Sequence, residues 1–411
     1  MGYDNYVFDY QRVPIEPNDK KILLVILDGL GGLPLNDKTE LESAWVPNLD
    51  RLAVNSSLGL LVPIARGVTP GSGAAHLALF GYDPLQYEVG RGVLEVLGLG
   101  LEPGPDDLCA RANFATVDSS GVITDRRAKR DGDRMSDQEC QELCALLQEK
   151  IERIDDVRVT IKAGKGHRFV VIFSGPGLAD GLTDSDPGKE GKMPARIEAL
   201  ESEAERSARI ANRFIELTAE VLKGRERANY VLLRGLALPP KLPSFPERYR
   251  LRAGAVAGFP MYRGIARLLG MEVLSCGDNW DSEVSTVEEN FDRFDFFYLH
   301  FKEFDQAGED GDFERKVELL EQFDERIVPR LTKMNFDVLC ITGDHSTPAV
   351  LRSHSWHSVP LLLHSRYIRP HSYAEEFGER ACIRGSLGVI YGQELLPMLL
   401  AYALRLGKFG A

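Results

Sequence analysis

The stretch Lys21–Gly29, KILLVILDG, decides the fold that we expect for this chain. Its apolar run, Ile22–Leu27, stops abruptly at Asp28-Gly29. An unbroken run of this kind is typical of a strand buried on both faces of a parallel sheet. Such sheets bind ligands at the carboxyl ends of their strands, so Asp28 is the first candidate for a functional residue. The alternative is that Asp-Gly marks only a turn.

Similar apolar runs recur along the chain, with helical patterns between several of them. The runs are Tyr230–Leu233, Asp295–Leu299, Val338–Thr342 and Val359–Leu363, and the helical patterns are Phe259–Leu269, Gly311–Met334 and Glu394–Leu406. This alternation predicts an α/β fold with a mostly parallel sheet flanked by helices.

The middle of the chain has a different pattern. Strands are expected at Asn113–Asp118, Val157–Lys162 and Arg168–Phe173, and helices after Ser136, with Glu139 completing a capping box, and from about Pro194 to Lys223. We therefore expect residues 106–250 to form a smaller α+β domain. It would be inserted into an α/β domain made of residues 1–105 and 251–411.

Composition limits the possible functions. The chain has 411 residues, 44% of them hydrophobic, and a net charge of −13, which predicts a folded globular protein that is a poor binder of nucleic acid or anionic membranes. No apolar run is long enough for a membrane span, and we do not expect residues 1–21, with three aspartates and no apolar stretch, to act as a secretory signal. Its six scattered cysteines favour reduced thiols in a cytoplasmic protein. An acidic chain of this kind could still carry a local basic pocket for a small anion, and its oligomeric state is left open.

Carboxylates and imidazoles stand at the predicted strand ends. Asp305 follows FFYLHFKEF, Asp344-His345 follows VLCIT, and His354 and His357 precede VPLLL. Aspartate, glutamate and histidine are ligands of zinc and manganese sites. Each position could be a turn or surface residue by itself, but together they predict a metal site at one sheet edge.

Ser72 lies in Gly67–His76, GVTPGSGAAH, ahead of a predicted helix. Backbone N–H groups at a helix N-terminus favour anions, and a hydroxyl beside a divalent cation becomes a nucleophile. The alternative is a serine that only caps the helix.

The expected inserted domain carries a basic run, Asp125–Arg130. Arg111, Lys165, His167, Arg168 and Arg234 lie near other predicted strand ends in it. Guanidinium groups bind phosphate and carboxylate, although a basic run can also be only solvated surface.

These motifs resemble a known family. They are Leu27-Asp28-Gly29, Thr69–Leu77 (TPGSGAAHL), Gly81–Pro84 (GYDP), Gly90-Arg91-Gly92, Arg111–Thr116 (RANFAT) and Thr342–Pro348 (TGDHSTP). In this order they are similar to those of the archaeal-type 2,3-bisphosphoglycerate-independent phosphoglycerate mutases, within the alkaline phosphatase superfamily. The resemblance runs from about residue 20 to the C-terminus, and bacteria also carry this type.

The resemblance implies an alkaline-phosphatase-like fold and a phosphoserine mechanism with two divalent cations. Manganese is the expected metal, with magnesium, cobalt or zinc as alternatives, and no 2,3-bisphosphoglycerate is needed. Ser72 would take the phosphoryl group from 3- or 2-phosphoglycerate and return it to the other hydroxyl of glycerate. The implied ligands of one cation are Asp28, Ser72, Asp344 and His345, and those of the other are Asp305, Glu309 and His354. The implied substrate-binding residues are Arg111, Arg126, Arg127, Arg130, His167, Arg168, Arg234 and Lys302.

Two positions depart from the family pattern. Glu309 stands where the family has a metal-binding histidine, and Ala74 stands where proline is frequent. We expect Glu309 to replace the histidine as a ligand, with His357 or a missing second metal as alternatives. A phosphomonoesterase of the same superfamily and an inactive metabolite-binding paralogue are the competing functions.

Overall fold

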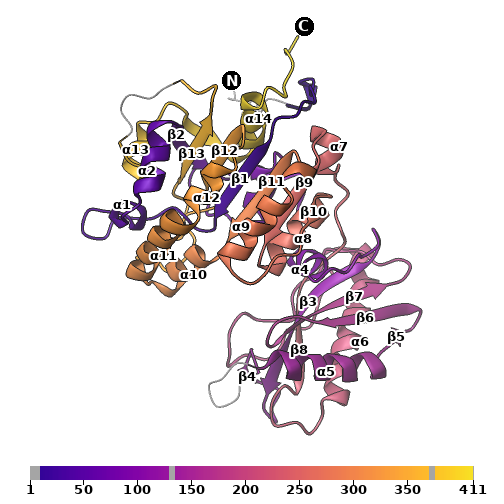
Figure 1. Ribbon diagram of the computed structural model, residues 1–411. Coiled ribbons are helices and arrows are strands. Elements are labelled where there is room, and N and C mark those ends of the chain that lie inside the picture. The colour runs from indigo at the N-terminus through magenta and orange to yellow at the C-terminus, as the bar shows by residue number, and fades with distance from the viewer. Residues whose placement is uncertain (1–9, 129–134, 370–374, 411) are drawn as a thin grey trace, which may run out of the picture. The chain divides into compact units, whose positions relative to one another are not determined.

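The computed structural model describes residues 10–128, 135–369 and 375–410, and the chain forms two compact units (Figure 1). Unit 1 comprises Met1–Tyr87 and Pro243–Ala411, and unit 2 comprises Glu88–Leu242. The expected inserted domain began at 106 and ended at 250. Unit 2 begins earlier because helix α4 (Arg91–Gly98) packs on the sheet of that unit.

Unit 1 is built on an eight-stranded sheet in the order β10-β9-β11-β1-β12-β13-β2-β14. Every neighbouring pair is parallel except those made by β13, which runs against β12 and β2. The strands are β1 (Ile22–Leu27), β2 (Ser57–Val62), β9 (Ala253–Ala257), β10 (Glu272–Val273), β11 (Phe296–Phe301), β12 (Val338–Thr342), β13 (Val359–Ser365) and β14 (Gly388–Tyr391). All residues of β1, β11 and β12 are buried, as the unbroken apolar runs predict.

Helices flank this sheet in two groups. In one group α3 packs against both α8 and α14, and another group contains α1, α2, α11 and α12. The helices of unit 1 are α1 (Glu40–Ser43), α2 (Pro47–Val54), α3 (Ser72–Leu79), α7 (Phe245–Tyr249), α8 (Pro260–Leu268), α9 (Trp280–Glu289), α10 (Glu303–Asp310), α11 (Phe313–Arg326), α12 (Val328–Lys333), α13 (Glu379–Ile383) and α14 (Gly392–Tyr402), with 3-10 turns at Tyr10–Arg12 and Phe291–Arg293. The predicted α/β fold is therefore confirmed.

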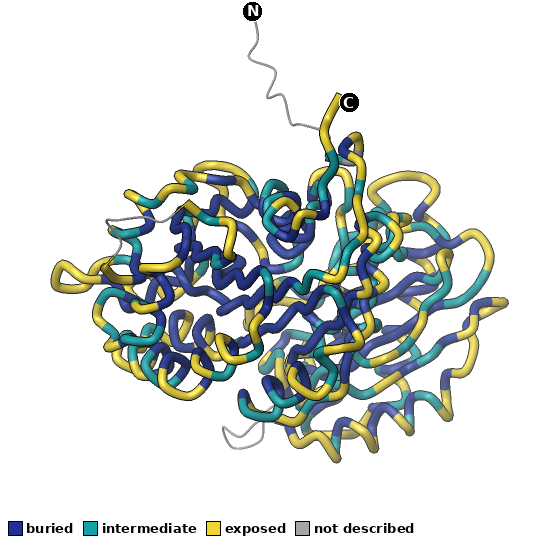
Figure 2. Tube along the Cα trace, turned by 45° about the horizontal axis from the view of Figure 1, so that its top comes forward, coloured by how far each residue is buried: buried dark blue, intermediate teal, exposed yellow. Residues whose placement is uncertain are grey.

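Unit 2 contains an antiparallel sheet in the order β4-β3-β7-β6-β5, with β8 also paired to β3. Its strands are β3 (Leu108–Val117), β4 (Ile123–Asp125), β5 (Arg153–Ile154), β6 (Val157–Ala163), β7 (Arg168–Ser174) and β8 (Tyr230–Ala237). Helices α5 (Asp137–Lys150) and α6 (Glu205–Val221) pack against each other and on the sheet, and α6 follows a 3-10 turn at Ser202–Ala204. Residues of these helices and of alternate strand positions are buried and form a core of unit 2. Figure 2 shows the buried residues in dark blue along the chain trace.

Several details differ from the sequence-based expectations. The run Tyr230–Leu233 belongs to β8 in the antiparallel sheet and not to the parallel one. The single helix expected at Gly311–Met334 is two helices, α11 and α12, because Pro329 lies in the first turn of the second. Ser136 caps α5 as expected, but Glu139 pairs with Arg227 at 2.5 Å instead of completing the capping box.

Candidate active site

The carboxyl edge of the unit 1 sheet collects the predicted functional residues. Strands β11, β1 and β12 are parallel and adjacent, so the segments after them meet at one edge. Because β13 is antiparallel to β12, the segment before β13 reaches the same edge. This topology brings together Asp28, Asp305, Asp344, His345 and His354.

A first cluster surrounds the Nε2 atom of His345. This atom lies 3.3 Å from Asp28 Oδ1, 3.3 Å from Asp344 Oδ2 and 3.2 Å from Ser72 Oγ. The carboxylates and the imidazole are fully buried, and Ser72 is 9% exposed. Asp28, Asp344 and His345 therefore form a compact group that could hold a metal ion, with the Ser72 hydroxyl next to it.

The hydrogen bonding of the two carboxylates fits a cation in this cluster. Asp344 accepts from the Gly29 N–H through Oδ1, while its Oδ2 has no hydrogen-bond partner among the described residues. Asp28 accepts from Tyr262 through Oδ2, while its Oδ1 is likewise without a partner in the part of the chain described. The two unpartnered oxygens are the ones that face His345, and buried oxygens of this kind need a donor or a cation.

The pKa values of these carboxylates follow from their surroundings. Burial and the neighbouring Asp28 raise the pKa of Asp344 well above its usual range. Burial would also raise the pKa of Asp28, but His300, whose Nε2 lies 3.2 Å from Asp28 Oδ2, and the charge of Lys302 hold it well below its usual range. Two carboxylates that share one buried space favour a positive charge between them.

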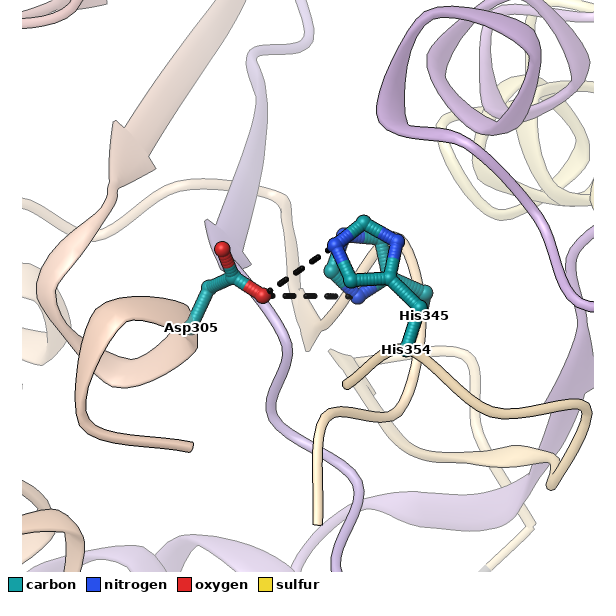
Figure 3. A group of neighbouring side chains, drawn as sticks. All are labelled: Asp305, His345 and His354. Atoms are coloured by element: carbon teal, nitrogen blue, oxygen red, sulfur yellow. Dashed lines mark ion pairs between the residues drawn. The ribbon is translucent and has the colours of Figure 1, made fainter. Parts of the chain in front are cut away.

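A second cluster contains Asp305, His345 and His354 (Figure 3). Asp305 Oδ1 lies 3.4 Å from His354 Nε2 and 4.0 Å from His345 Nδ1, and the two imidazole rings stack at 3.6 Å. Glu309 lies one turn after Asp305 on α10, with Oε1 3.8 Å from His354 Nε2 and its side chain 56% exposed. Glu309 is thus close enough to join this cluster. His357, the alternative, contacts Ser355 and Trp356 instead.

Lys302 connects the two clusters. Its ammonium lies 3.1 Å from Asp28 Oδ2 and donates to Asp305 Oδ2. Burial would lower the pKa of Lys302, but the two aspartates raise it. The lysine therefore supplies a fixed positive charge at the strand ends.

Ser72 is the first residue of α3, and the neighbouring Gly71 occupies the N-cap position. Because Gly71 stands at the N-cap and makes no side-chain cap, the alternative role of Ser72 as a capping serine is wrong. Its hydroxyl points to His345 instead.

Sequence reasoning missed several residues around these clusters. Tyr262 and His300 both contact Asp28 Oδ2, His76 lies 3.4 Å from Asp344 Oδ2, and Thr347 contacts Asp305. His76 lies within the motif TPGSGAAHL, and Thr347 lies within the motif TGDHSTP. Tyr262 and His300 have no signal in the sequence beyond their places near a predicted helix start and strand end.

One face of the unit 2 sheet carries a basic cluster. Side chains alternate along a strand, so Arg111 lies on the face opposite to Ala110 and Ala112, which belong to the core. Arg111 is directly opposite Arg234 in the β3–β8 ladder, and its guanidinium is 3.7 Å from Glu95 of α4. Burial lowers the pKa of Arg111 to about 10, and the charges of Arg168, Arg91 and Arg234 act in the same direction.

His167 belongs to the same cluster. Burial and the positive charges of Arg168, Arg127 and Arg111 lower its pKa to about 4. Arg126, in contrast, donates two hydrogen bonds to Asp186, at 2.9 and 2.7 Å. Arg130 lies outside the described residues. The structure thus groups five predicted residues and adds Arg91, which the sequence analysis did not select as a site residue.

Comparison with known proteins agrees with these features. The family model for 2,3-bisphosphoglycerate-independent phosphoglycerate mutase matches residues 53–227. A protein of Thermotoga neapolitana described as a probable 2,3-bisphosphoglycerate-independent phosphoglycerate mutase is 50% identical over 397 residues, which cover 97% of each chain. This chain belongs to that family. A relative from Thermus thermophilus with the same description is 50% identical over 396 residues, covering 95% of this chain and 96% of the relative.

Solved structures agree with membership of the phosphoglycerate mutase family, whose members are isomerases. A protein from Pyrococcus horikoshii superposes with a TM-score of 0.80 at 31% identity, covering 96% of this chain and 100% of that one. The cofactor-independent phosphoglycerate mutase from Thermoplasma acidophilum superposes with a TM-score of 0.68 at 29% identity, covering 93% and 100%. Among the described residues, no helix is both long enough and apolar enough to span a membrane.

Proposed function

We propose that this protein interconverts 3-phosphoglycerate and 2-phosphoglycerate through a phosphoserine on Ser72, without 2,3-bisphosphoglycerate. The observation that carries the proposal is the convergence of Ser72 Oγ with the unpartnered oxygens of Asp28 and Asp344 around His345 Nε2. A nucleophile beside a set of metal ligands is the arrangement that phosphoryl transfer requires. The reaction belongs to glycolysis and gluconeogenesis, and we place the enzyme in the cytoplasm.

We assign two divalent metal ions to the two clusters. Asp28, Ser72, Asp344 and His345 would hold one ion, and Asp305, Glu309 and His354 would hold the other. Bound ions would stabilise negative charge on the Ser72 oxygen and on the transferring phosphoryl group. Carboxylate-rich ligand sets suit manganese, which is our first choice over magnesium, cobalt and zinc.

The residues of the chain then have the following roles. Ser72 Oγ loses its proton and forms a bond to phosphorus, while the bond from phosphorus to the substrate oxygen breaks and that oxygen takes up a proton. Lys302 supplies positive charge next to Asp28 and Asp305. The basic cluster of unit 2 is our candidate for the groups that bind the carboxylate of glycerate, since guanidinium forks match carboxylate geometry. In the return step the second hydroxyl of glycerate loses its proton and forms a bond to phosphorus. The bond from phosphorus to Ser72 Oγ breaks, and Ser72 Oγ takes up a proton.

An enolase-coupled assay tests this proposal. Metal-stripped protein receives Mn²⁺, Mg²⁺, Co²⁺ or Zn²⁺ separately, with 3-phosphoglycerate and no 2,3-bisphosphoglycerate. We expect 2-phosphoglycerate to form only after metal is restored, and acid-quenched enzyme to carry phosphate on Ser72. Release of free phosphate in place of 2-phosphoglycerate would favour a phosphomonoesterase. No turnover with any metal would favour the inactive paralogue.

A further inference from the structure

Thr347 contacts both candidate metal clusters through a single atom. Its side chain is fully buried, and its Oγ1 donates to Asp305 Oδ1 at 2.7 Å. The same Oγ1 lies 2.9 Å from Nδ1 of His345, the residue that belongs to both clusters. No other role is evident for this hydroxyl.

The two contacts determine where the proton of His345 lies. A hydroxyl has one hydrogen, and Thr347 gives it to the Asp305 carboxylate, which can only accept. Thr347 Oγ1 must then accept from His345, so Nδ1 carries the proton. The lone pair of a neutral His345 is therefore on Nε2, the atom that faces Asp28, Asp344 and Ser72. Outer hydrogen bonds of this kind fix the tautomer and orientation of metal-binding histidines.

The backbone of Thr347 is itself held in place by a buried lysine. Lys316 of α11 is fully buried, and its ammonium donates to the carbonyl oxygens of Gly29 at 2.9 Å, Gly31 at 3.2 Å and Thr347 at 3.0 Å. The Thr347 N–H also contacts the Gly29 and Gly31 oxygens, at 3.3 and 3.1 Å. An ammonium has three donors, and each has a carbonyl here. Lys316 thus joins the segment after Asp28 to the segment after His345.

Two glycines allow these segments to approach each other. A Cβ atom on Gly308 of α10 would lie 2.1 Å from the Thr347 carbonyl oxygen, and one on Gly29 would lie 2.7 Å from Thr347 Oγ1. Both separations are below van der Waals contact, so a side chain at either position would displace Thr347. Thr347, in the segment after β12, is therefore closely packed against the segments after β1 and β11.

We infer that Thr347 is a positioning residue for both proposed metal ions, acting through His345 and Asp305, with Lys316 as the internal cation that holds it. The inference rests on the proposed two-metal function. Loss of the hydroxyl removes the acceptor that fixes the His345 tautomer and the donor that orients Asp305. Because Asp305 is assigned to one ion and the Nε2 atom of His345 to the other, one substitution weakens both metal sites.

Metal titration of three variants tests the inference on the full-length, metal-stripped protein. Thr347→Val keeps the shape and removes the hydroxyl, while Thr347→Ser keeps the hydroxyl. Thr218→Val is the matched control, since Thr218 is also fully buried and its hydroxyl donates to the Ile215 carbonyl oxygen within helix α6 of unit 2. With Mn²⁺ in a calorimeter, we expect Thr347→Val to lose about 10- to 100-fold in affinity at both sites. Thr347→Ser should regain most of this loss, and Thr218→Val should match wild type.

The outcomes separate this inference from the proposed function. Wild-type protein that takes up no Mn²⁺ would refute the two-metal function itself. Two wild-type ions with unchanged affinities in Thr347→Val, or a loss confined to one ion, would overturn the role of Thr347. If Thr347→Val does not fold, nitrogen NMR of histidine-labelled, metal-free wild type decides the question. A proton on Nδ1 of His345 supports the inference, and a proton on Nε2 overturns it.

Discussion

Ser72 opens α3 with its hydroxyl directed at His345, so its removal should separate catalysis from folding. We expect Ser72→Ala to abolish mutase activity. The free energy of unfolding should change by no more than about 1 kcal/mol, because one hydrogen bond is lost and alanine is the better helix former. Activity in the enolase-coupled assay and urea denaturation measure the two effects.

Substantial turnover by Ser72→Ala would rule out a phosphoserine at this position. Loss of several kcal/mol of stability would instead show that the hydroxyl has a structural role.

Glu309 is the residue at which this chain departs from the family pattern. Its carboxylate is 3.8 Å from His354 Nε2, and it follows Asp305 by one helical turn. We expect Glu309→Ala to weaken one of two Mn²⁺ sites and to lower activity at limiting metal, with recovery at high Mn²⁺. An anionic ligand in place of a neutral one should also favour Mn²⁺ or Mg²⁺ over Zn²⁺.

Asp310→Asn is the control for this experiment, since Asp310 is exposed on the same helix and outside both clusters. If Glu309→Ala binds two metal ions and keeps full activity, Glu309 is not a metal ligand.

Single residues also show how far the sequence could predict the site. The sequence predicts the ligand candidates because each of them stands near an apolar run, and parallel strands bring such positions together. These candidates are Asp28, Asp305, Asp344, His345 and His354. The sequence does not predict the contacts of Tyr262, His300 and Lys316, because these contacts depend on which helix or strand packs beside which strand end. A lysine with three carbonyl partners has the same sequence signature as a lysine on the surface.

At the level of elements, replacing Arg126 of unit 2 should mainly affect stability, whereas replacing Arg111 should mainly affect substrate binding. Arg126 is tied to the buried Asp186 by two hydrogen bonds. Arg111 lies opposite Arg234 in the β3–β8 ladder, and Glu95 is 3.7 Å from its guanidinium. We expect Arg126→Ala to lower the free energy of unfolding by about 1–3 kcal/mol and to leave the KM for phosphoglycerate nearly unchanged. Arg111→Ala should raise the KM several-fold with little change in stability. A raised KM in Arg126→Ala alone would reverse the two roles.

The Arg126–Asp186 pair also predicts a pH dependence. Burial would raise the pKa of Asp186, but the hydrogen bonds from Arg126 hold it below its usual value. A carboxylate with a depressed pKa in the folded state stabilises the protein above its unfolded pKa, about 3.9, and loses this contribution as the pH falls through the folded value. The stability difference between wild type and Arg126→Ala should therefore be largest near neutral pH and shrink below about pH 4. Chemical denaturation at several pH values measures this difference, and a constant difference would contradict it.

The strands that the sequence predicts differ from the strand that it misses in the size of their side chains. Strands β1, β11 and β12 are buried on both faces, and their apolar runs are unmistakable. Strand β9, AGAVA, was missed because its small residues resemble a loop, yet it pairs with β11 in the parallel sheet. Strand direction could not be predicted from the sequence either, since the apolar run of β13 is the same whether the strand is parallel or antiparallel.

For the whole molecule, the main consequence is that the candidate metal ligands and the basic cluster belong to different units. The chain passes from one unit to the other at Tyr87–Glu88 and Leu242–Pro243. The core that contains Phe114, Phe169 and Phe214 lies entirely within unit 2. We expect residues 88–242 to fold as an isolated fragment with no mutase activity, and circular dichroism of that fragment checks this. An unfolded fragment would mean that unit 2 depends on unit 1.

Calorimetry of the full chain then tests where the metal acts. Every proposed ligand lies in unit 1, so Mn²⁺ should stabilise that unit and leave unit 2 unaffected. A ligand at 100 times its dissociation constant adds about 2.7 kcal/mol for one site, which corresponds to roughly 5–10 °C for a unit of this size. We expect two transitions, of which only one moves with Mn²⁺, and the isolated 88–242 fragment identifies the other. A metal-dependent shift in the transition of unit 2 would place a ligand outside the sheet edge, and the two-cluster assignment would fail.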